Sequence, residues 1–211
     1  KHRMEKQLDE VRLQMLKNQI NPHFLFNTLN MIASTAQIED ADTTEKMIHA
    51  LSRLFRYNLK STDSVMPLER ELKVVQDYMY LQQMRFGQRI RYDTDCKPDT
   101  MEVLVPSFAL QPLVENAIIH GISPKGQGGR IHVRSWMEGR RLWISVADTG
   151  RGMAQERLEE IRLALARGEE KATGVGVGNI YRRVHGMYRD GEVFIYSSEG
   201  RGTVVQMAFT P

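Results

Sequence analysis

The sequence predicts an α+β protein, with a helical first part followed by a layered α/β second part that contains a mixed sheet. Two observations support this division. Of the 16 glycines, only Gly87 precedes residue 121, so turns and ligand loops are concentrated in the second part. Apolar residues recur at steps of three and four before Gly87, whereas alternation with a period of two is prominent after it.

The composition is that of an ordinary globular protein and excludes several classes. The 211 residues are enough for one large domain or two small ones. A net charge of +3, with both signs interleaved, gives no support to nucleic-acid binding. The one cysteine, Cys96, excludes an internal disulfide and favours a reducing compartment.

The first residues indicate a piece of a longer protein. The chain opens with Lys1 inside a charged helical pattern, and it contains no apolar run long enough to cross a bilayer. We therefore expect the cytoplasmic part of a membrane protein, with any transmembrane segment upstream of residue 1.

Three amphipathic helices are predicted in the first part, over residues 1–36, 44–60 and 67–86. Each carries an apolar stripe at heptad spacing. The stripes are Met4-Leu8-Val11-Met15, Met47-Leu51-Leu54 and Leu68-Leu72-Val75-Met79. A single helical hairpin leaves such stripes uncovered, so we expect two copies of the chain to pair into a four-helix bundle.

The second part is predicted to mix strands with helices. Alternating apolar residues indicate the strands, and a Gly139-Arg140 turn joins two of them into a hairpin. Longer apolar periodic segments indicate the helices, the first of which should open at Pro106. The expected strands are 89–95, 131–136, 142–146, 192–198 and 203–209, and the expected helices are 106–120, 154–167 and 179–189.

A histidine lies in the most unusual stretch of the helical part. His23, Asn27 and Asn30 follow each other at steps of four and three, which places them in a polar stripe on one helix face. Pro22 either kinks this helix or, with Asn21 as the cap, begins a new one. A neutral imidazole is a nucleophile, so His23 is a candidate acceptor in covalent catalysis. The alternative is a histidine that merely occupies a helix surface.

Two polar residues interrupt the apolar helix predicted before Gly121. Glu115 and Asn116 need partners there, because an unpaired buried polar group is costly. Mg²⁺ held together with phosphate oxygens would supply them, since this ion takes few protein ligands. The alternative is a pair of buried polar side chains that are satisfied by other protein groups.

Two glycine-rich segments follow. Asp148-Thr149-Gly150-Arg151-Gly152 ends a predicted strand, and its alternating glycines permit close approach of a ligand to the backbone. Gly174-Val175-Gly176-Val177-Gly178-Asn179 opens the last predicted helix, where free N–H groups and the helix dipole favour an anion. A tight turn and a flexible linker are the respective alternatives. The second segment matches neither the dinucleotide fingerprint nor the P-loop.

In this order the three signals resemble the N, G1 and G2 boxes of the GHKL ATPase superfamily, which includes gyrase, Hsp90, MutL and histidine kinases. The segment Asn21-Pro22-His23-Phe24-Leu25-Phe26-Asn27 resembles the phosphoacceptor motif of the LytS/YesM-type sensor histidine kinases. This resemblance implies a dimerisation and histidine phosphotransfer domain over 1–88, built on a helical hairpin. It also implies a GHKL (Bergerat) α/β sandwich that binds ATP over 89–211.

The resemblance implies roles for individual residues of the nucleotide site. Asn116 would bind Mg²⁺, with Glu115 and His120 in the same motif. Asp148 would accept a hydrogen bond from the adenine amino group, near Thr203. The remaining residues would shape the adenine loop and the phosphate loop: Gly150, Gly152, Gly174, Gly176, Gly178 and Asn179.

The implied activity is that of a two-component sensor histidine kinase. A homodimer would bind Mg-ATP, phosphorylate its own His23 and pass the phosphoryl group to an aspartate of a response-regulator receiver domain. Phe24 stands where many histidine kinases have an acid, so no general base is evident beside His23. Asn27, one helical turn later, either holds a water for dephosphorylation of the regulator or merely solvates the helix surface.

Two other functions share these motifs. A GHKL-type ATPase would use Glu115 to activate water, as in the chaperone and topoisomerase relatives. A nucleotide-binding pseudokinase would signal only by rearrangement of the dimer. The helical segment around His23 disfavours the first alternative, and the complete set of Asn116, Asp148 and loop glycines disfavours the second.

Overall fold

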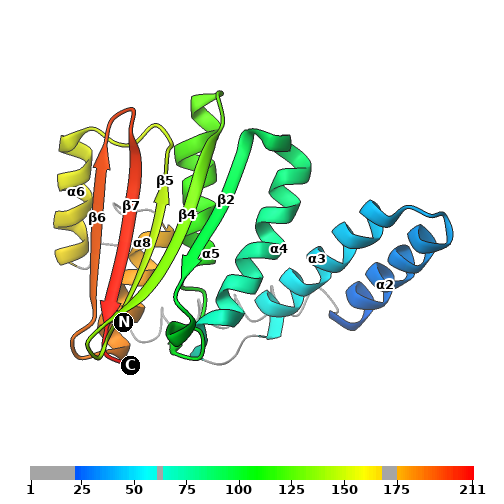
Figure 1. Ribbon diagram of the computed structural model, residues 1–211, viewed down its shortest axis with the longest axis horizontal. Coiled ribbons are helices and arrows are strands. Elements are labelled where there is room, and N and C mark those ends of the chain that lie inside the picture. The colour runs from blue at the N-terminus through cyan, green and yellow to red at the C-terminus, as the bar shows by residue number, and fades with distance from the viewer. Residues whose placement is uncertain (1–21, 61–63, 168–174) are drawn as a thin grey trace, which may run out of the picture. The chain divides into compact units, whose positions relative to one another are not determined.

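A computed structural model of the chain describes residues 22–60, 64–167 and 175–211 (Figure 1). The chain divides into two compact units, residues 1–61 and 62–211. The first contains helices α2 (Pro22–Ile38) and α3 (Asp42–Lys60), and the second contains the strands and the other described helices. The expected order of a helical part followed by a mixed α/β part is confirmed.

The first unit is a helical hairpin whose contact surface is built largely from small residues. Ala33, Ala36 and Ala50 are each at most 4% exposed, so the two helix backbones approach closely. Leu54 is also buried, whereas Leu51 is exposed. The expectation that both leucines face a partner subunit is therefore wrong for Leu54, which is already covered in the single chain.

The expected helix over 1–36 is described only from residue 22 onward, as α2. The stripe Met4-Leu8-Val11-Met15 lies outside the described residues. Among the described helices, none combines the length and the apolar character that crossing a bilayer requires.

A five-stranded mixed sheet forms one layer of the second unit. The strand order is β2-β4-β5-β7-β6, with β2 parallel to β4 and every other neighbouring pair antiparallel. All five strands were predicted from alternation, with bounds within a few residues. They are β2 (Ile90–Cys96), β4 (Gly129–Glu138), β5 (Arg141–Asp148), β6 (Glu192–Ser198) and β7 (Gly202–Phe209).

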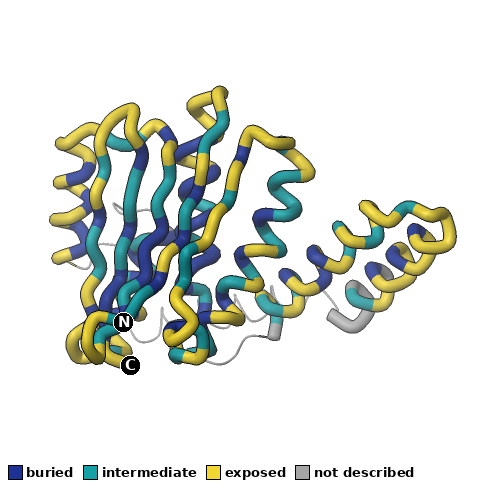
Figure 2. The backbone as a smooth tube through the Cα atoms, viewed as in Figure 1, coloured by how far each residue is buried: buried dark blue, intermediate teal, exposed yellow. Residues whose placement is uncertain are grey.

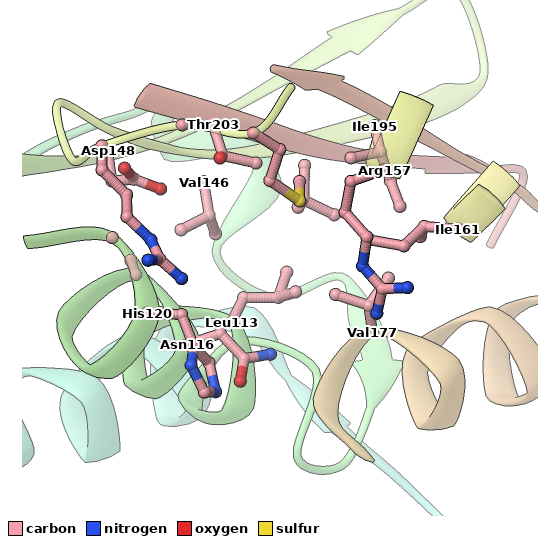
Figure 3. Close-up of a pocket in the computed structure, with 16 residues that line it drawn as sticks. Leu113, Asn116, His120, Val146, Asp148, Arg157, Ile161, Val177, Ile195 and Thr203 are labelled. Atoms are coloured by element: carbon pink, nitrogen blue, oxygen red, sulfur yellow. The ribbon is translucent and has the colours of Figure 1, made fainter. Parts of the chain in front are cut away.

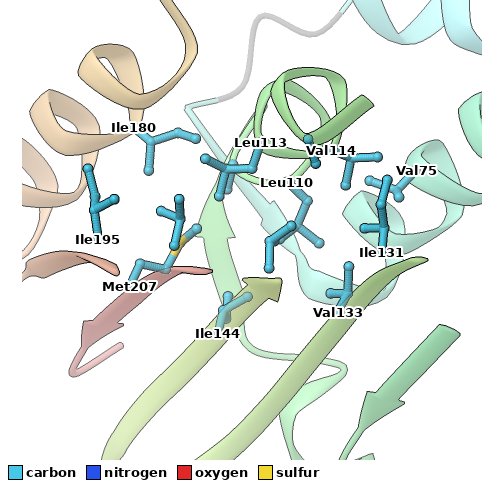
Figure 4. Close-up of a cluster of buried hydrophobic side chains, with 14 of the residues drawn as sticks. Val75, Leu110, Leu113, Val114, Ile131, Val133, Ile144, Ile180, Ile195 and Met207 are labelled. Carbon is cyan, nitrogen blue, oxygen red and sulfur yellow. The ribbon is translucent and has the colours of Figure 1, made fainter. Parts of the chain in front are cut away.

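Helices cover one face of this sheet, and the buried residues are concentrated in the central strands β4, β5 and β7 (Figure 2). Ile131, Ile144 and Met207 point into the core from three neighbouring strands, where they meet Leu113 and Ile180 from helices (Figure 4). Because strand side chains alternate, the residues between them lie on the opposite, outer face. The covering helices are α4 (Leu68–Phe86), α5 (Gln111–Asn116), α6 (Gln155–Ala166) and α8 (Val175–Met187).

The helix expected to open at Pro106 is wrong at its start. Residues Leu104–Pro106 form strand β3, which pairs antiparallel with β1 (Val65–Pro67). Phe108 then adopts φ +59°, a left-handed conformation that interrupts any helix, and α5 begins only at Gln111. A π-helical stretch, Ala117–Ile122, continues α5 toward residue 122.

A buried carboxylate fixes this turn. Glu71 of α4 is fully buried, and its two carboxylate oxygens accept hydrogen bonds from the backbone N–H groups of Phe108, at 2.9 Å, and Leu110, at 3.0 Å. These are charge-assisted bonds, which are stronger than bonds between neutral groups. Glu71 thus holds the entry of α5 against α4 and substitutes for a helix cap.

Helix α4 packs within the second unit, although the sequence groups it with the phosphotransfer domain. Its Val75 and Met79 belong to the core under the sheet. The compact units divide after residue 61. The functional division after residue 88 stays a prediction.

The Glu71 contact predicts a large and local effect on stability. Glu71→Ala removes both acceptors and leaves two N–H groups unsatisfied, so we expect the free energy of unfolding to fall by about 3 kcal/mol. Urea denaturation followed by circular dichroism measures this change. Glu69→Ala, at an exposed position of the same helical turn, should cost less than about 1 kcal/mol. Equal losses of stability in the two variants would contradict a special role for the Glu71 hydrogen bonds.

Candidate functional site

A cavity of about 430 Å³ lies between the sheet and the helices of the second unit. Asp148 and Thr203 lie on one side of it, and Asn116 and His120 lie on the opposite side (Figure 3). Gly152 also lines the cavity. The fold thus brings five predicted site residues to one cavity, although they come from segments far apart in the sequence.

Asp148 is the last residue of β5 and provides a half-buried carboxylate. Its Oδ1 accepts a hydrogen bond from the N–H of Gly150 at 2.7 Å. Burial raises the pKa of Asp148 above its ordinary value, while backbone hydrogen bonds from Gly150 and Thr203 partly oppose that shift. A partly desolvated acceptor with no ion-pair partner among the described residues is suited to a ligand that donates a hydrogen bond.

Glycines allow the backbone segments around Asp148 to pack in direct contact. A Cβ atom on Gly150 would lie 2.3 Å from the carbonyl carbon of Gly121, so the two segments touch through backbone alone. A Cβ atom on Gly121 would lie 2.8 Å from Oδ1 of Asp148. Gly152 has φ +65°, and a Cβ there would lie 1.9 Å from the carbonyl oxygen of Ser198. These glycines therefore position the loop.

The last predicted helix begins earlier than expected. Helix α8 includes residues from Val175 onward, so Gly176, Gly178 and Asn179 lie inside its first turns. A Cβ on Gly176 would lie 2.3 Å from Nδ2 of Asn116, which brings the start of α8 against the end of α5.

Among the described residues of this glycine-rich segment, only Val177 lines the cavity, and it was not predicted. Gly178 is buried, and the side-chain oxygen of Asn179 accepts a hydrogen bond from Arg182. Gly174 lies outside the described residues.

Glu115 does not line the cavity. Its Oε1 accepts a hydrogen bond from Nε2 of Gln111 at 2.8 Å. Burial, together with the Glu115 carboxylate, raises the pKa of Tyr78 on α4 to about 12. Glu115 is therefore directed to protein partners, which is the alternative that the sequence left open for this residue.

Sequence reasoning missed two polar residues that line the cavity and one that supports its lining. The hydroxyl of Ser197 accepts a hydrogen bond from the N–H of Met153 at 2.9 Å and lies 2.9 Å from the Thr203 hydroxyl. Arg151 and Arg157 line the cavity as cations. Arg151 stands inside the glycine loop that the sequence singled out, whereas only the fold shows that Arg157 lines the cavity and that Ser197 supports Thr203.

The other predicted residues belong to the first unit. His23 lies in α2, and Asn27 is exposed one turn later on the same helix. The ring of Phe26, between them, is covered by the guanidinium of Arg56 of α3 at 5.3 Å.

No group of three or more His, Cys, Asp or Glu side chains within the described part of the chain could hold a metal ion on its own. A metal near Asn116 would therefore need ligands from a bound molecule. Phosphate oxygens are the natural ligands, because Mg²⁺ is commonly held by few protein groups and by substrate phosphates.

Two family models match the chain, in the order that the sequence motifs predict. The model described as "Histidine kinase" matches residues 11–90. The model described as "Histidine kinase-, DNA gyrase B-, and HSP90-like ATPase" matches residues 106–211, which contain the whole cavity. The chain therefore belongs to the histidine kinase-, DNA gyrase B- and HSP90-like ATPase family, on its histidine kinase branch.

Curated relatives confirm the resemblance to LytS-type sensor histidine kinases. The sensor histidine kinase YpdA of Escherichia coli is 36% identical over 87% of this chain and 32% of its own length. The sensor protein LytS of Staphylococcus saprophyticus is 33% identical over 93% of this chain and 33% of its own length. The chain thus spans about a third of the length of these relatives.

Solved structures share the fold at low sequence identity. The histidine kinase domain of the blue-light activated histidine kinase from Erythrobacter litoralis EL346 has a TM-score of 0.51 and 18% identity, over 97% of this chain and 93% of that one. Full-length ShkA in complex with AMPPNP has the same TM-score and identity, over 95% and 45%. Both support the expected fold class.

The close approach of Gly150 to Gly121 predicts that no side chain is tolerated there. Gly150→Ala should lower the free energy of unfolding by about 1–3 kcal/mol, because its methyl group forces two backbone segments apart. Gly186→Ala in α8 is the matched control, since its added methyl meets open space. It should stabilise the chain by about 0.5–1 kcal/mol. Thermal and urea unfolding measure both, and a neutral Gly150→Ala would refute the packing argument.

Proposed function

We propose that this chain is the catalytic core of a two-component sensor histidine kinase, acting in the cytoplasm. It binds Mg-ATP in the cavity, transfers the γ-phosphoryl group to His23 and passes that group to a response-regulator aspartate. The observation that carries the proposal is the cavity itself. It combines a desolvated Asp148 carboxylate on one side with Asn116 and His120 on the other.

The Asp148 side of the cavity suits adenine. The carboxylate accepts a hydrogen bond from the exocyclic amino group, and the Thr203 hydroxyl, held by Ser197, lies beside it. Apolar side chains provide the surfaces that a purine ring needs. Those that line the cavity are Leu113, Val146, Ile161, Val177, Ile195 and Val205.

The opposite side suits phosphates. Asn116 offers a neutral ligand to Mg²⁺, and Arg151 and Arg157 add positive charge to the cavity wall. The start of α8 touches Asn116 through Gly176, which brings helix N–H groups close to the same region. A phosphate chain bound here would complete the metal coordination that the protein leaves open.

The proposed chemistry transfers one phosphoryl group twice, first to His23 and then to an aspartate of the regulator. A neutral ring nitrogen of His23 forms a bond to the γ-phosphorus as the bond from that phosphorus to the bridging oxygen breaks, and ADP leaves. The carboxylate of the regulator later attacks the same phosphorus, and the N–P bond breaks. Positioning and charge stabilisation carry such reactions, which makes a missing acid at Phe24 tolerable.

The first unit provides the surfaces for a second copy of the chain and for the response regulator. The exposed Leu51 and the helices around it form the expected dimer interface, which a second copy of the chain would cover. Asn27 is exposed beside the position of His23, so it is accessible to a docked receiver domain. We keep the role of holding a water for dephosphorylation as a proposal for Asn27.

The two alternative functions receive less support. A water-activating base must reach the γ-phosphate, whereas Glu115 is engaged by Gln111 and lies outside the cavity lining. This geometry disfavours a simple ATPase. A pseudokinase would need a defect in the site, and the cavity retains Asn116, Asp148 and Thr203.

His23→Gln tests the phosphoacceptor. The variant should lose all acid-labile, base-stable label from γ-labelled ATP, while its affinity for an ATP analogue changes less than twofold, because its nucleotide cavity is intact. His49→Gln, on α3, is the matched control and should keep its label. Label that persists in His23→Gln would reject the assignment. Free phosphate without protein label would indicate the ATPase, and neither product would indicate the pseudokinase.

Asp148→Asn tests adenine recognition. The amide keeps one acceptor but adds a donor that faces the base, so affinity for an ATP analogue should fall about 10- to 150-fold, the range for a lost hydrogen bond to a charged group. Calorimetry measures it. Asp99→Asn, on an exposed turn distant in sequence from the cavity lining, should bind normally. Equal affinities in the two variants would show that the base is recognised elsewhere.

A further inference from the structure

A separate groove borders the loop Asp148-Thr149-Gly150, which we call the adenine loop. It has a volume of about 550 Å³ and lies where strands β2 and β4 begin. Its polar lining comprises Gln88, Arg89, Arg91, Gln127, Arg130 and Thr149. None of these residues lines the nucleotide cavity, although Thr149 is the direct neighbour of Asp148.

The groove concentrates positive charge that the protein neutralises only in part. Arg91 and Arg130 are directly paired on the parallel strands β2 and β4, so two like charges stand side by side on the outer face. Arg130 is bound by the carboxylate of Asp93 at 3.1 Å. Arg91 has no ion-pair partner among the residues that the structure describes, and Arg89 donates only to the carbonyl oxygen of Phe86.

The floor of the groove is closely packed backbone. A Cβ on Gly128 would lie 2.2 Å from the carbonyl oxygen of Arg89, and one on Gly129 would lie 3.0 Å from the Thr149 hydroxyl. The backbone therefore packs directly against both walls.

We propose that this groove binds a pyrophosphate group, either free or as part of a nucleoside polyphosphate. Guanidinium groups bind phosphate oxygens in bidentate geometry, and the amides and hydroxyl of the lining add donors. Three arginines and one aspartate leave a charge of +2 at the groove, which calls for a ligand that carries more than one negative charge. The groove is open to solvent, so a nucleoside attached to the phosphates is accommodated.

Binding here is transmitted to Asp148 through Thr149. The N–H of Arg130 donates to the Thr149 hydroxyl at 2.9 Å, and the N–H of Thr149 donates to the carbonyl oxygen of Arg130 at 3.0 Å. Nζ of Lys125 donates to the carbonyl oxygen of Thr149 at 3.1 Å. A ligand that immobilises Arg130 therefore restrains the adenine loop and raises the affinity of the nucleotide cavity. This coupling rests on the proposed nucleotide site, whereas the groove itself does not.

Amide NMR of the full chain, titrated with inorganic pyrophosphate, locates the site. The amide signals of Gly128, Gly129 and Thr149 should shift and saturate. Arg91→Gln should weaken this affinity at least tenfold, and Arg91→Lys, which keeps the charge but loses the fork, should weaken it less. Arg140→Gln, on the exposed hairpin turn, should match the wild type. Shifts confined to amides around Asn116, or an unchanged Arg91→Gln, would overturn the proposal.

Two further titrations define the ligand. Shifts of the same groove amides by ADP identify a nucleoside polyphosphate, whereas a response to pyrophosphate alone identifies the free anion. Stronger binding of a poly-glutamate peptide than of pyrophosphate would overturn the phosphate assignment.

A separate titration tests the coupling. The affinity for an ATP analogue should rise about fivefold or more with pyrophosphate in the wild type but not in Arg91→Gln. An unchanged affinity overturns the coupling, and absent nucleotide binding with intact groove shifts overturns the proposed function alone.

Discussion

The buried Glu71 carboxylate is the contact on which the nucleotide site depends. It comes from α4, which packs on the sheet through its own apolar stripe, and it fixes the backbone at Phe108 and Leu110 just before α5 begins. The position of α5 decides where Asn116 stands relative to Asp148. A buried carboxylate without hydrogen-bond donors would be costly in this core. Glu71 therefore depends on the turn for its donors, and the turn depends on Glu71 for its acceptors.

The walls of the cavity can approach each other because glycines stand at their points of contact. Gly121 and Gly150 bring the end of α5 against the loop after β5, and Gly176 brings α8 against Asn116. Burial raises the pKa of Asp148, so the protein environment disfavours the charged form of this acid. A bound donor would remove that penalty.

Local patterns predicted most of this architecture, and long-range contacts account for the failures. Strand alternation gave all five strands of the main sheet, and helical periodicity gave α3, α4 and α6. The turn at Pro106 was missed because β3 pairs with β1, and because Glu71 reads as an ordinary surface residue of an amphipathic helix. The start of α8 was placed too late because glycine disfavours helices, whereas packing of Gly176 against Asn116 overrides that preference. The motifs identified Asp148 and Thr203, but Arg157 and Ser197 carry no local signal.

The single parallel pair of the sheet explains why the cavity and the arginine-lined groove meet at one loop. Because β2 runs parallel to β4, and β4 antiparallel to β5, the beginnings of β2 and β4 lie at the same edge as the end of β5. Successive residues of a strand point to opposite faces, so Asp148 faces the helices while Thr149, directly after it, lies in the groove behind. One short loop therefore borders a purine-sized cavity on one side and an arginine-lined groove on the other. An interaction on either side acts on the same few backbone hydrogen bonds, and no longer pathway is needed to connect them.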